Sequence, residues 1–202
     1  EVPVTLPEAF RWGSDPRLAV DHAPGGTLTE AFAATWPTIT PFREFDDFGH
    51  RITERVVESL ATRDPSTLEF RGLLADGWQS DPEGRWLRVH IRPGARFSDG
   101  ASVTAADVRW TFHEFVLDME VQAARARSVL SPIARIEVID DATVEFRFHD
   151  ATFLNLACAL EMPVLPRHFY DRFTPEELNR STGLLMGSGP YRLAVSPTAT
   201  QW

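Results

Sequence analysis

Several short stretches of the chain alternate between apolar and polar residues, and this period of two predicts β-strands with one buried face. The clearest stretch is 86–92, where Leu87, Val89 and Ile91 share one face and polar residues occupy the other. The other candidate strands are 27–32, 135–139, 143–148 and 191–195. Because Asp140-Asp141-Ala142 separates two of them, we expect a hairpin there.

Other stretches space their apolar residues three or four positions apart, which predicts amphipathic helices. One covers residues 49–63, and two shorter ones are expected at 120–130 and 153–160. The longest apolar stripe consists of Val108, Phe112, Phe115 and Met119. We expect the first three of these side chains to be buried on one helix face.

Two of the predicted helices begin with a capping pattern, in which a threonine is followed three residues later by an acid. Thr104 and Asp107 form one pair, and Thr174 and Glu177 form the other. The chain therefore combines helices with hairpins instead of alternating strictly between helices and parallel strands. This combination predicts a mixed α/β (α+β) fold.

The composition of the chain narrows its possible partners. The 202 residues include 20 basic and 29 acidic ones, which leaves a net charge of −9. Because phosphate backbones repel an acidic chain, we expect no nucleic-acid partner. The single cysteine, Cys158, lies in an apolar stretch, so a buried thiol is expected there rather than a nucleophile.

The polar residues show no pattern typical of catalysis or metal binding. The six histidines lack partners at metal-ligand spacing, and no nucleophile, base and orienting residue occur together. Gly187-Ser188-Gly189 precedes Pro190 and a candidate strand, so it lacks the helix N-terminus that anion-binding loops use. We expect no enzymatic activity, no metal and no cofactor.

Three phenylalanines, Phe42, Phe45 and Phe48, lie in or beside a proline-broken loop that precedes the helix expected at 49–63. They either pack this loop onto the domain or line a ligand cleft, since small-molecule sites are mostly apolar. Their spacing leaves both possibilities open.

A longer motif runs from residue 92 to residue 108. Arg-Pro-Gly-Ala-Arg-Phe-Ser-Asp-Gly at 92–100 closes a strand with a turn, and Val-Thr-Ala-Ala-Asp-Val at 103–108 opens a helix. This motif resembles the signature of the family 5 solute-binding proteins, which serve ABC importers. Further segments agree with that family in order and spacing, namely 25–28, 40–41, 57–60, 74–78, 138–144, 165–168 and 187–191.

The resemblance implies a fold like that of the type II periplasmic binding proteins, with the family's extra small α/β subdomain. It assigns residues 1–47 to an N-terminal arm and the start of the first lobe, and 48–186 to the small subdomain. Residues 187–202 become a strand that returns to the first lobe. Family members are more than twice as long, so we expect a fragment from which the second lobe is absent.

The resemblance also implies a function in transport. A solute, most often a peptide, is captured between two lobes near a hinge and delivered to the permease subunits of an ABC importer. The implied location is periplasmic or extracellular, with or without a lipoprotein anchor, although residues 1–4 do not form a signal peptide. The alternatives are a ligand-sensing domain of the same fold in a transcriptional regulator and, less favoured, a hydrolase.

By position, the resemblance places ligand contacts in the loop before the first helix and at one later dipeptide. The implied residues are Phe45, Phe48, Gly49, His50, Glu161 and Met162. The resemblance further implies a functional monomer, while the exposed edges of a fragment could pair with another copy.

Overall fold

The computed structural model describes residues 39–41, 47–115, 117 and 119–194. The side chains at 47, 48, 114 and 115 lie outside this description. The candidate strand at 27–32 lies outside the described residues as well, and so do Phe42 and Phe45.

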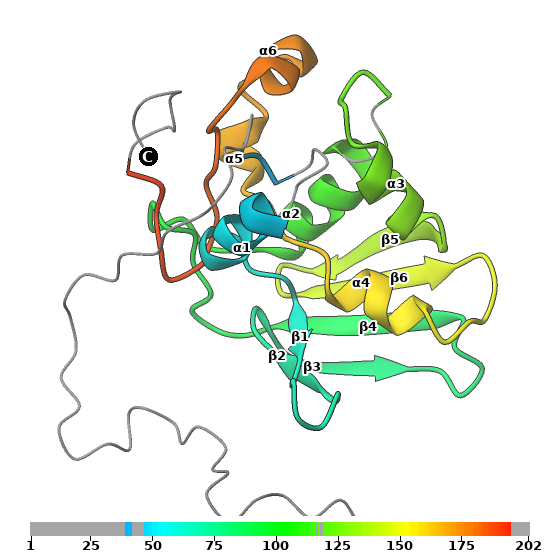
Figure 1. Ribbon diagram of the computed structural model, residues 1–202. Helices are drawn as coiled ribbons and strands as arrows, with labels where there is room; N and C mark the ends of the chain where they lie inside the picture. The colour runs from blue at the N-terminus through cyan, green and yellow to red at the C-terminus, as the bar shows by residue number, and fades with distance from the viewer. Residues whose placement is uncertain (1–38, 42–46, 116, 118, 195–202) are drawn as a thin grey trace, which may run out of the picture. The chain divides into compact units, whose positions relative to one another are not determined.

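A four-stranded antiparallel sheet is the main β-structure of the described residues (Figure 1). Its strands, in spatial order, are β3 (Ala75–Ser80), β4 (Trp86–Ile91), β6 (Thr143–Phe148) and β5 (Ile133–Asp140). The hairpin expected around Asp140 is confirmed, because β5 pairs with β6 and Asp140 Oδ1 accepts a hydrogen bond from the Ala142 N–H. A separate ribbon pairs β1 (Ala61–Arg63) with β2 (Phe70–Gly72).

One face of the four-stranded sheet is buried, as the alternating pattern predicts. Leu87, Val89 and Ile91 of β4 are at most 2% exposed, and Val144 and Phe146 of β6 lie opposite Val89 and Leu87. The helical segment α2 (Ala105–Arg109) and the π-helical turn η2 (Trp110–Phe115) contact the β5–β6 side of this core. The ring centroids of Phe112 and Phe146 are 5.2 Å apart.

Five further helices complete the described structure. They are α1 (Asp47–Val56), α3 (Ala124–Leu130), α4 (Asn155–Leu160), α5 (Arg167–Tyr170) and α6 (Pro175–Arg180). Both predicted caps are confirmed: Thr104 and Asp107 form a capping box at α2, and Thr174 and Glu177 form one at α6. The mixture of helices and antiparallel strands confirms the α+β class.

Several predicted element boundaries are wrong. The helix expected at 49–63 ends at Val56, after which Ser59 bridges to Pro163 and residues 61–63 form β1. The apolar spacing misled here because residues 57 and 60 are buried beyond the last residue of the helix, in the bent segment that leads into β1. The helix expected at 120–130 begins only at Ala124.

The ends of two other predicted elements also differ. Met119 is 79% exposed, since the helical segment that carries Val108 and Phe112 ends at Phe115. Phe153 is 89% exposed and precedes α4 rather than belonging to it. Residues 191–194 form no strand, although Tyr191 makes one backbone hydrogen bond.

Predicted subdomain boundaries at 47/48 and 186/187 are not tested by these elements and stay predictions. In the part of the chain that the structure describes, no helix combines the length and the apolar character that a membrane crossing requires.

Candidate ligand-binding site

The first predicted contact region lies in the N-terminal turn of α1. Gly49 is buried, and its carbonyl accepts a hydrogen bond of 3.0 Å from the Thr53 hydroxyl. His50 is exposed, and its Nε2 lies 2.8 Å from a carboxylate oxygen of Glu54. Phe45 and the side chain of Phe48 lie outside the described residues, and of the predicted contacts in this region His50 is the one whose side chain the structure describes as exposed.

The second predicted contact region, Glu161 and Met162, directly follows α4. The Glu161 carboxylate accepts a hydrogen bond of 2.7 Å from Arg63 Nε and is 41% exposed. Met162 is only 9% exposed, so its side chain belongs to the core and offers little surface to a ligand. Within this dipeptide, Glu161 is the residue that remains accessible.

The two predicted regions lie near opposite ends of α1. The Val164 N–H donates to the Glu58 carbonyl, which places the strand after Met162 beside the chain that leaves α1 at its C-terminus. Gly49 lies in the first turn of the same helix, about 10 Å from Val56 along the axis at 1.5 Å per residue. The structure therefore does not bring the two regions together into one cluster.

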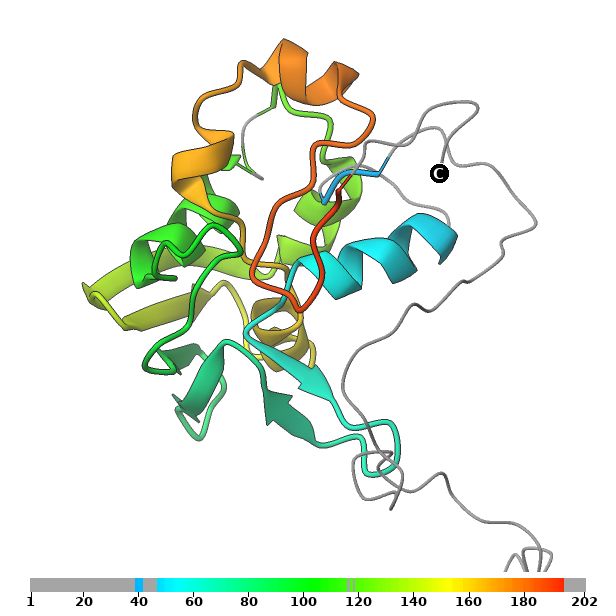
Figure 2. The same ribbon diagram turned by 90° about the vertical axis from the view of Figure 1, so that its left-hand side faces the viewer.

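A loop from the far end of the chain closes the C-terminus of α1 (Figures 1 and 2). The N–H of Gly189 donates to the Val56 carbonyl at 2.8 Å, and that of Tyr191 donates to the Arg55 carbonyl at 3.2 Å. These bonds satisfy carbonyls that a helix end leaves unpaired. The Gly187–Gly189 loop thus binds a helix C-terminus, in agreement with the prediction that it is no anion-binding loop.

The same loop is also bound by the turn that ends the 92–100 motif. The Ser98 N–H donates to the Gly187 carbonyl, and Gly100 has the positive φ of 95° that this reversal requires. Asp99 Oδ2 lies 2.6 Å from His168 Nε2 of α5. The motif is structural in this molecule, because it ties α5 and the Gly187 loop together.

The pKa of Asp99 reflects opposing influences. Partial burial is the largest and acts to raise the pKa of this carboxyl. The hydrogen bonds from His168 and from the Ala101 N–H act together in the opposite direction, and they leave the pKa below its ordinary value. Asp99 is therefore the charged partner of His168 at neutral pH.

A few buried polar side chains in the described part of the chain have no hydrogen-bond partner. Among the described residues, the buried atoms that lack a hydrogen-bond partner are Thr40 Oγ1, Glu58 Oε2, Ser188 Oγ and Arg147 Nε. The first three belong to segments that precede α1, follow it or dock on its C-terminus. Because these atoms are buried, they offer no surface to a ligand and do not by themselves mark a binding site.

No feature of the described residues favours catalysis. No group of three or more His, Cys, Asp or Glu side chains is placed there to hold a metal ion. Cys158 is a free, buried thiol, and burial raises its pKa to about 11. A thiol in such surroundings is a poor nucleophile, which agrees with the prediction that it is structural.

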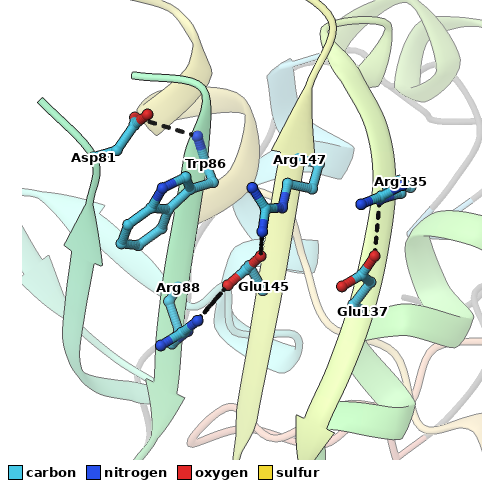
Figure 3. Close-up of polar contacts among 7 residues, drawn as sticks. All are labelled: Asp81, Trp86, Arg88, Arg135, Glu137, Glu145 and Arg147. Carbon is cyan, nitrogen blue, oxygen red and sulfur yellow. Dashed lines mark hydrogen bonds and ion pairs between the residues drawn. The ribbon is translucent and has the colours of Figure 1, made fainter. Parts of the chain in front are cut away.

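The second face of the sheet carries a network of charged residues that the sequence did not reveal. Figure 3 shows Glu145 of β6 between two guanidinium groups, with Arg88 Nη2 at 2.6 Å and Arg147 Nη2 at 2.5 Å. The Glu145 side chain is only 2% exposed although it lies on the polar face. Arg135 and Glu137 form a further pair on β5. Arg88 pairs with Glu145 across β4 and β6, whereas the other two ion pairs each join residues two positions apart on one strand. Pairing across and along the strands explains this network without a ligand.

The comparison with protein families identifies the chain. Residues 69–199 match the middle region of the bacterial extracellular solute-binding proteins, family 5. The chain belongs to this family, which confirms the resemblance and the fold expected from it. The family and its solved members are binding proteins rather than enzymes, so the hydrolase alternative has no support.

Among curated relatives, the peptidoglycan-binding protein YepA of Agrobacterium fabrum is 32% identical, with 93% of this chain and 31% of YepA covered. The oligopeptide-binding protein AppA of Bacillus subtilis, solved with a nonapeptide, is 26% identical at a TM-score of 0.62. That match covers 74% of this chain and 30% of AppA.

A second similar structure was solved with a sugar instead of a peptide. A periplasmic oligopeptide-binding protein of Thermotoga maritima, solved with mannohexaose, is 30% identical at a TM-score of 0.59. The match covers 67% of this chain and 25% of that protein. The chain thus spans about a third or less of the length of the proteins it resembles.

Proposed function

We propose that the chain takes part in capturing a peptide outside the cytoplasm for delivery to an ABC importer. The observation that carries this proposal is the family match over residues 69–199. It is supported by the similarity to AppA, whose structure holds a nonapeptide, and to YepA, which is named as peptidoglycan-binding. Peptidoglycan contains short peptides, so both names suggest a peptide-like solute.

The proposed contact surface is the part of the molecule around α1. Its N-terminal turn presents His50, and the proposed contacts there also include Phe45, Phe48 and Gly49. Because the chain spans about a third of its relatives, we propose that this surface forms one side of a cleft. Closure of two lobes over the solute would then complete the site.

A sugar is the second candidate solute, and the mannohexaose-bound relative is the observation that favours it. We prefer a peptide because the two predicted contact regions each offer a polar pair, His50 with Glu54 in one and the ion pair of Arg63 with Glu161 in the other. Charged pairs suit the termini and side chains of a peptide better than the hydroxyls of a neutral sugar.

Calorimetric titration of the protein with peptides of two to nine residues and with mannohexaose tests this proposal. We expect saturable binding of at least one peptide and none of mannohexaose. His50→Ala should weaken peptide binding by about tenfold, which corresponds to about 1.4 kcal/mol, whereas His149→Ala at an exposed sheet end should leave it unchanged. Binding of mannohexaose without any peptide would contradict the proposed solute class.

A further inference from the structure

Arg63, the last residue of β1, contacts side chains from two other segments, and a third segment supports one of these contacts. Its register partner in the ribbon is Phe70, and the guanidinium carbon lies 4.8 Å from the centroid of that ring. Trp78 of β3 contacts Phe70 edge-on at 6.4 Å. Glu161, after α4, accepts the Arg63 Nε–H at 2.7 Å. Arg63 is thereby positioned before any ligand arrives, and such preorganisation lowers the cost of binding.

The two charged groups have hydrogen-bonding capacity left over. Among the described residues, Arg63 has no polar partner other than Glu161, so the N–H groups of its two terminal nitrogens remain available. Oε2 of Glu161 likewise has no partner within the described part of the chain. Both side chains are nearly half exposed, at 46% and 41%. The pair therefore presents the N–H donors of Arg63 next to an acceptor, Oε2 of Glu161.

The helix dipole of α4 is an alternative explanation for the position of Arg63. Arg63 lies beside the C-terminus of α4, where a cation interacts favourably with the helix dipole. That explanation accounts for the position of the charge. It does not account for the guanidinium lying over the Phe70 ring while only its Nε bonds to Glu161, which leaves the paired terminal donors for a second carboxylate.

We propose that Arg63 and Glu161 bind the C-terminal end of a peptide solute. This inference rests on the proposed function and adds to it the group that is recognised. The terminal nitrogens of Arg63 pair with the C-terminal carboxylate, and Oε2 of Glu161 accepts the N–H of the last peptide bond. The half-buried rings of Phe70 and Trp78 lie beside the pair, where they offer apolar contact to the last side chain.

Two matched peptides test this inference, one with a free C-terminal carboxylate and one with a C-terminal amide. We expect the protein to bind the free acid at least about tenfold more tightly, because the amide removes the charge that Arg63 pairs with. Arg63→Gln should abolish this preference. Arg71→Gln is the control, since Arg71 lies in the same ribbon opposite Thr62 and hence on the other face. It should keep the preference.

The possible outcomes separate this inference from the proposed function. If the protein binds the acid and the amide equally well, peptides are its solutes but Arg63 does not recognise their C-terminus, and the inference is wrong. If neither peptide binds, the proposed function fails and the inference fails with it. Should Arg63→Gln not fold by circular dichroism, Arg63→Lys serves instead. Lysine keeps the charge but loses the paired donors, so the preference for the free acid over the amide should fall to a few-fold. An undiminished preference would show that the two terminal nitrogens of Arg63 do not bind the carboxylate together.

Discussion

Positions 187 and 189 need glycine because there is no room for a Cβ atom, and not because the backbone has a positive φ there. A Cβ at Gly187 would lie 2.4 Å from the Val56 carbonyl oxygen, and one at Gly189 would lie 2.5 Å from that of Arg55. Both neighbours are backbone atoms of α1, which cannot rotate away as a flexible side chain could. The two glycines therefore let the loop approach the helix closely enough for its N–H groups to reach the terminal carbonyls.

Gly189→Ala should lower the free energy of unfolding by about 1–3 kcal/mol, the usual range for overpacking a close contact. Gly77→Ala is the matched control, because a Cβ at that strand position meets nothing within 4 Å. It should change stability by no more than about 0.5 kcal/mol. Urea unfolding followed by tryptophan fluorescence measures both, and equal effects at the two positions would show that the loop can move away from α1.

Cys158 gives a second prediction for a single residue. With its pKa raised to about 11 by burial, only roughly one thiol in a thousand is ionised at pH 8, and it is also shielded from reagents. We expect no reaction with a thiol-specific disulfide reagent in the native protein and rapid reaction of one equivalent in urea. Rapid labelling of the native protein would mean that the thiol is accessible.

Among the secondary-structure elements, the α2–η2 segment shows where the apolar spacing in the sequence stops predicting which side chains are buried. Val108 and Phe112 are buried on the sheet, whereas Met119 follows at the same spacing and is 79% exposed. The helical segment ends at Phe115, between Phe112 and Met119. The apolar spacing therefore continues in the sequence beyond the end of the helix.

This difference can be measured by truncation. Phe112→Ala should cost about 3–5 kcal/mol, since it removes a ring that is 2% exposed and packs on Phe146. Met119→Ala should cost less than about 0.5 kcal/mol because its side chain is already in solvent. Thermal unfolding of the two variants beside the parent protein gives the comparison. A loss below about 1 kcal/mol for Phe112→Ala would contradict its place in the core.

The sequence predicted best those elements whose signal is local. Alternation identified β4, β5 and β6, and threonine–acid pairs identified the starts of α2 and α6. The short elements β1, β2 and α5 were missed, because three or four residues cannot display a period. The end of α1 was missed because buried residues continue beyond it in the segment that leads into β1.

The candidate site was less accessible to sequence reasoning, because its contacts join distant residues. Arg63 and Glu161 are 98 positions apart, and Asp99 and His168 are 69 apart. Nothing in the neighbouring residues marks these pairs. Glu145 lies on the polar face of β6, yet two arginines from β4 and β6 bury it there. Position in the resembling family indicated Glu161, but only the fold shows its partner.

For the whole molecule, several acidic side chains couple folding to pH. The pKa of Asp64 is lowered chiefly by the Ser66 N–H, that of Asp140 by the Ala142 N–H, and that of Glu177 by the Thr174 N–H. All three accept these bonds in turns or caps that exist only in the folded chain. A carboxyl whose folded pKa is depressed stabilises the protein above its unfolded pKa of about 4.

We therefore expect stability to be constant from about pH 7 to pH 5 and to decline as the pH falls below about 4, through the folded pKa values. Urea midpoints at pH 7, 5, 4 and 3 measure this decline. Asp140→Asn keeps a side-chain oxygen for the turn but removes the titrating group, so its decline should be shallower. A midpoint that stays unchanged between pH 4 and pH 3 would contradict the expected contribution of these carboxyls.

The backbone hydrogen bonds around α1 have a consequence for how this part of the chain could be rearranged. The Ile39 N–H donates to the Thr182 carbonyl at 3.0 Å, and the loop at 187–191 binds the end of α1. The path leading into the sheet and the path leading out of it are thus adjacent. Segments with neighbouring ends can be inserted into a surface loop of another protein with little disturbance of the host. Residues 57–188 have the geometry of such a transplantable insert, because the Val56 carbonyl and the Gly189 N–H that flank them are joined by a hydrogen bond of 2.8 Å.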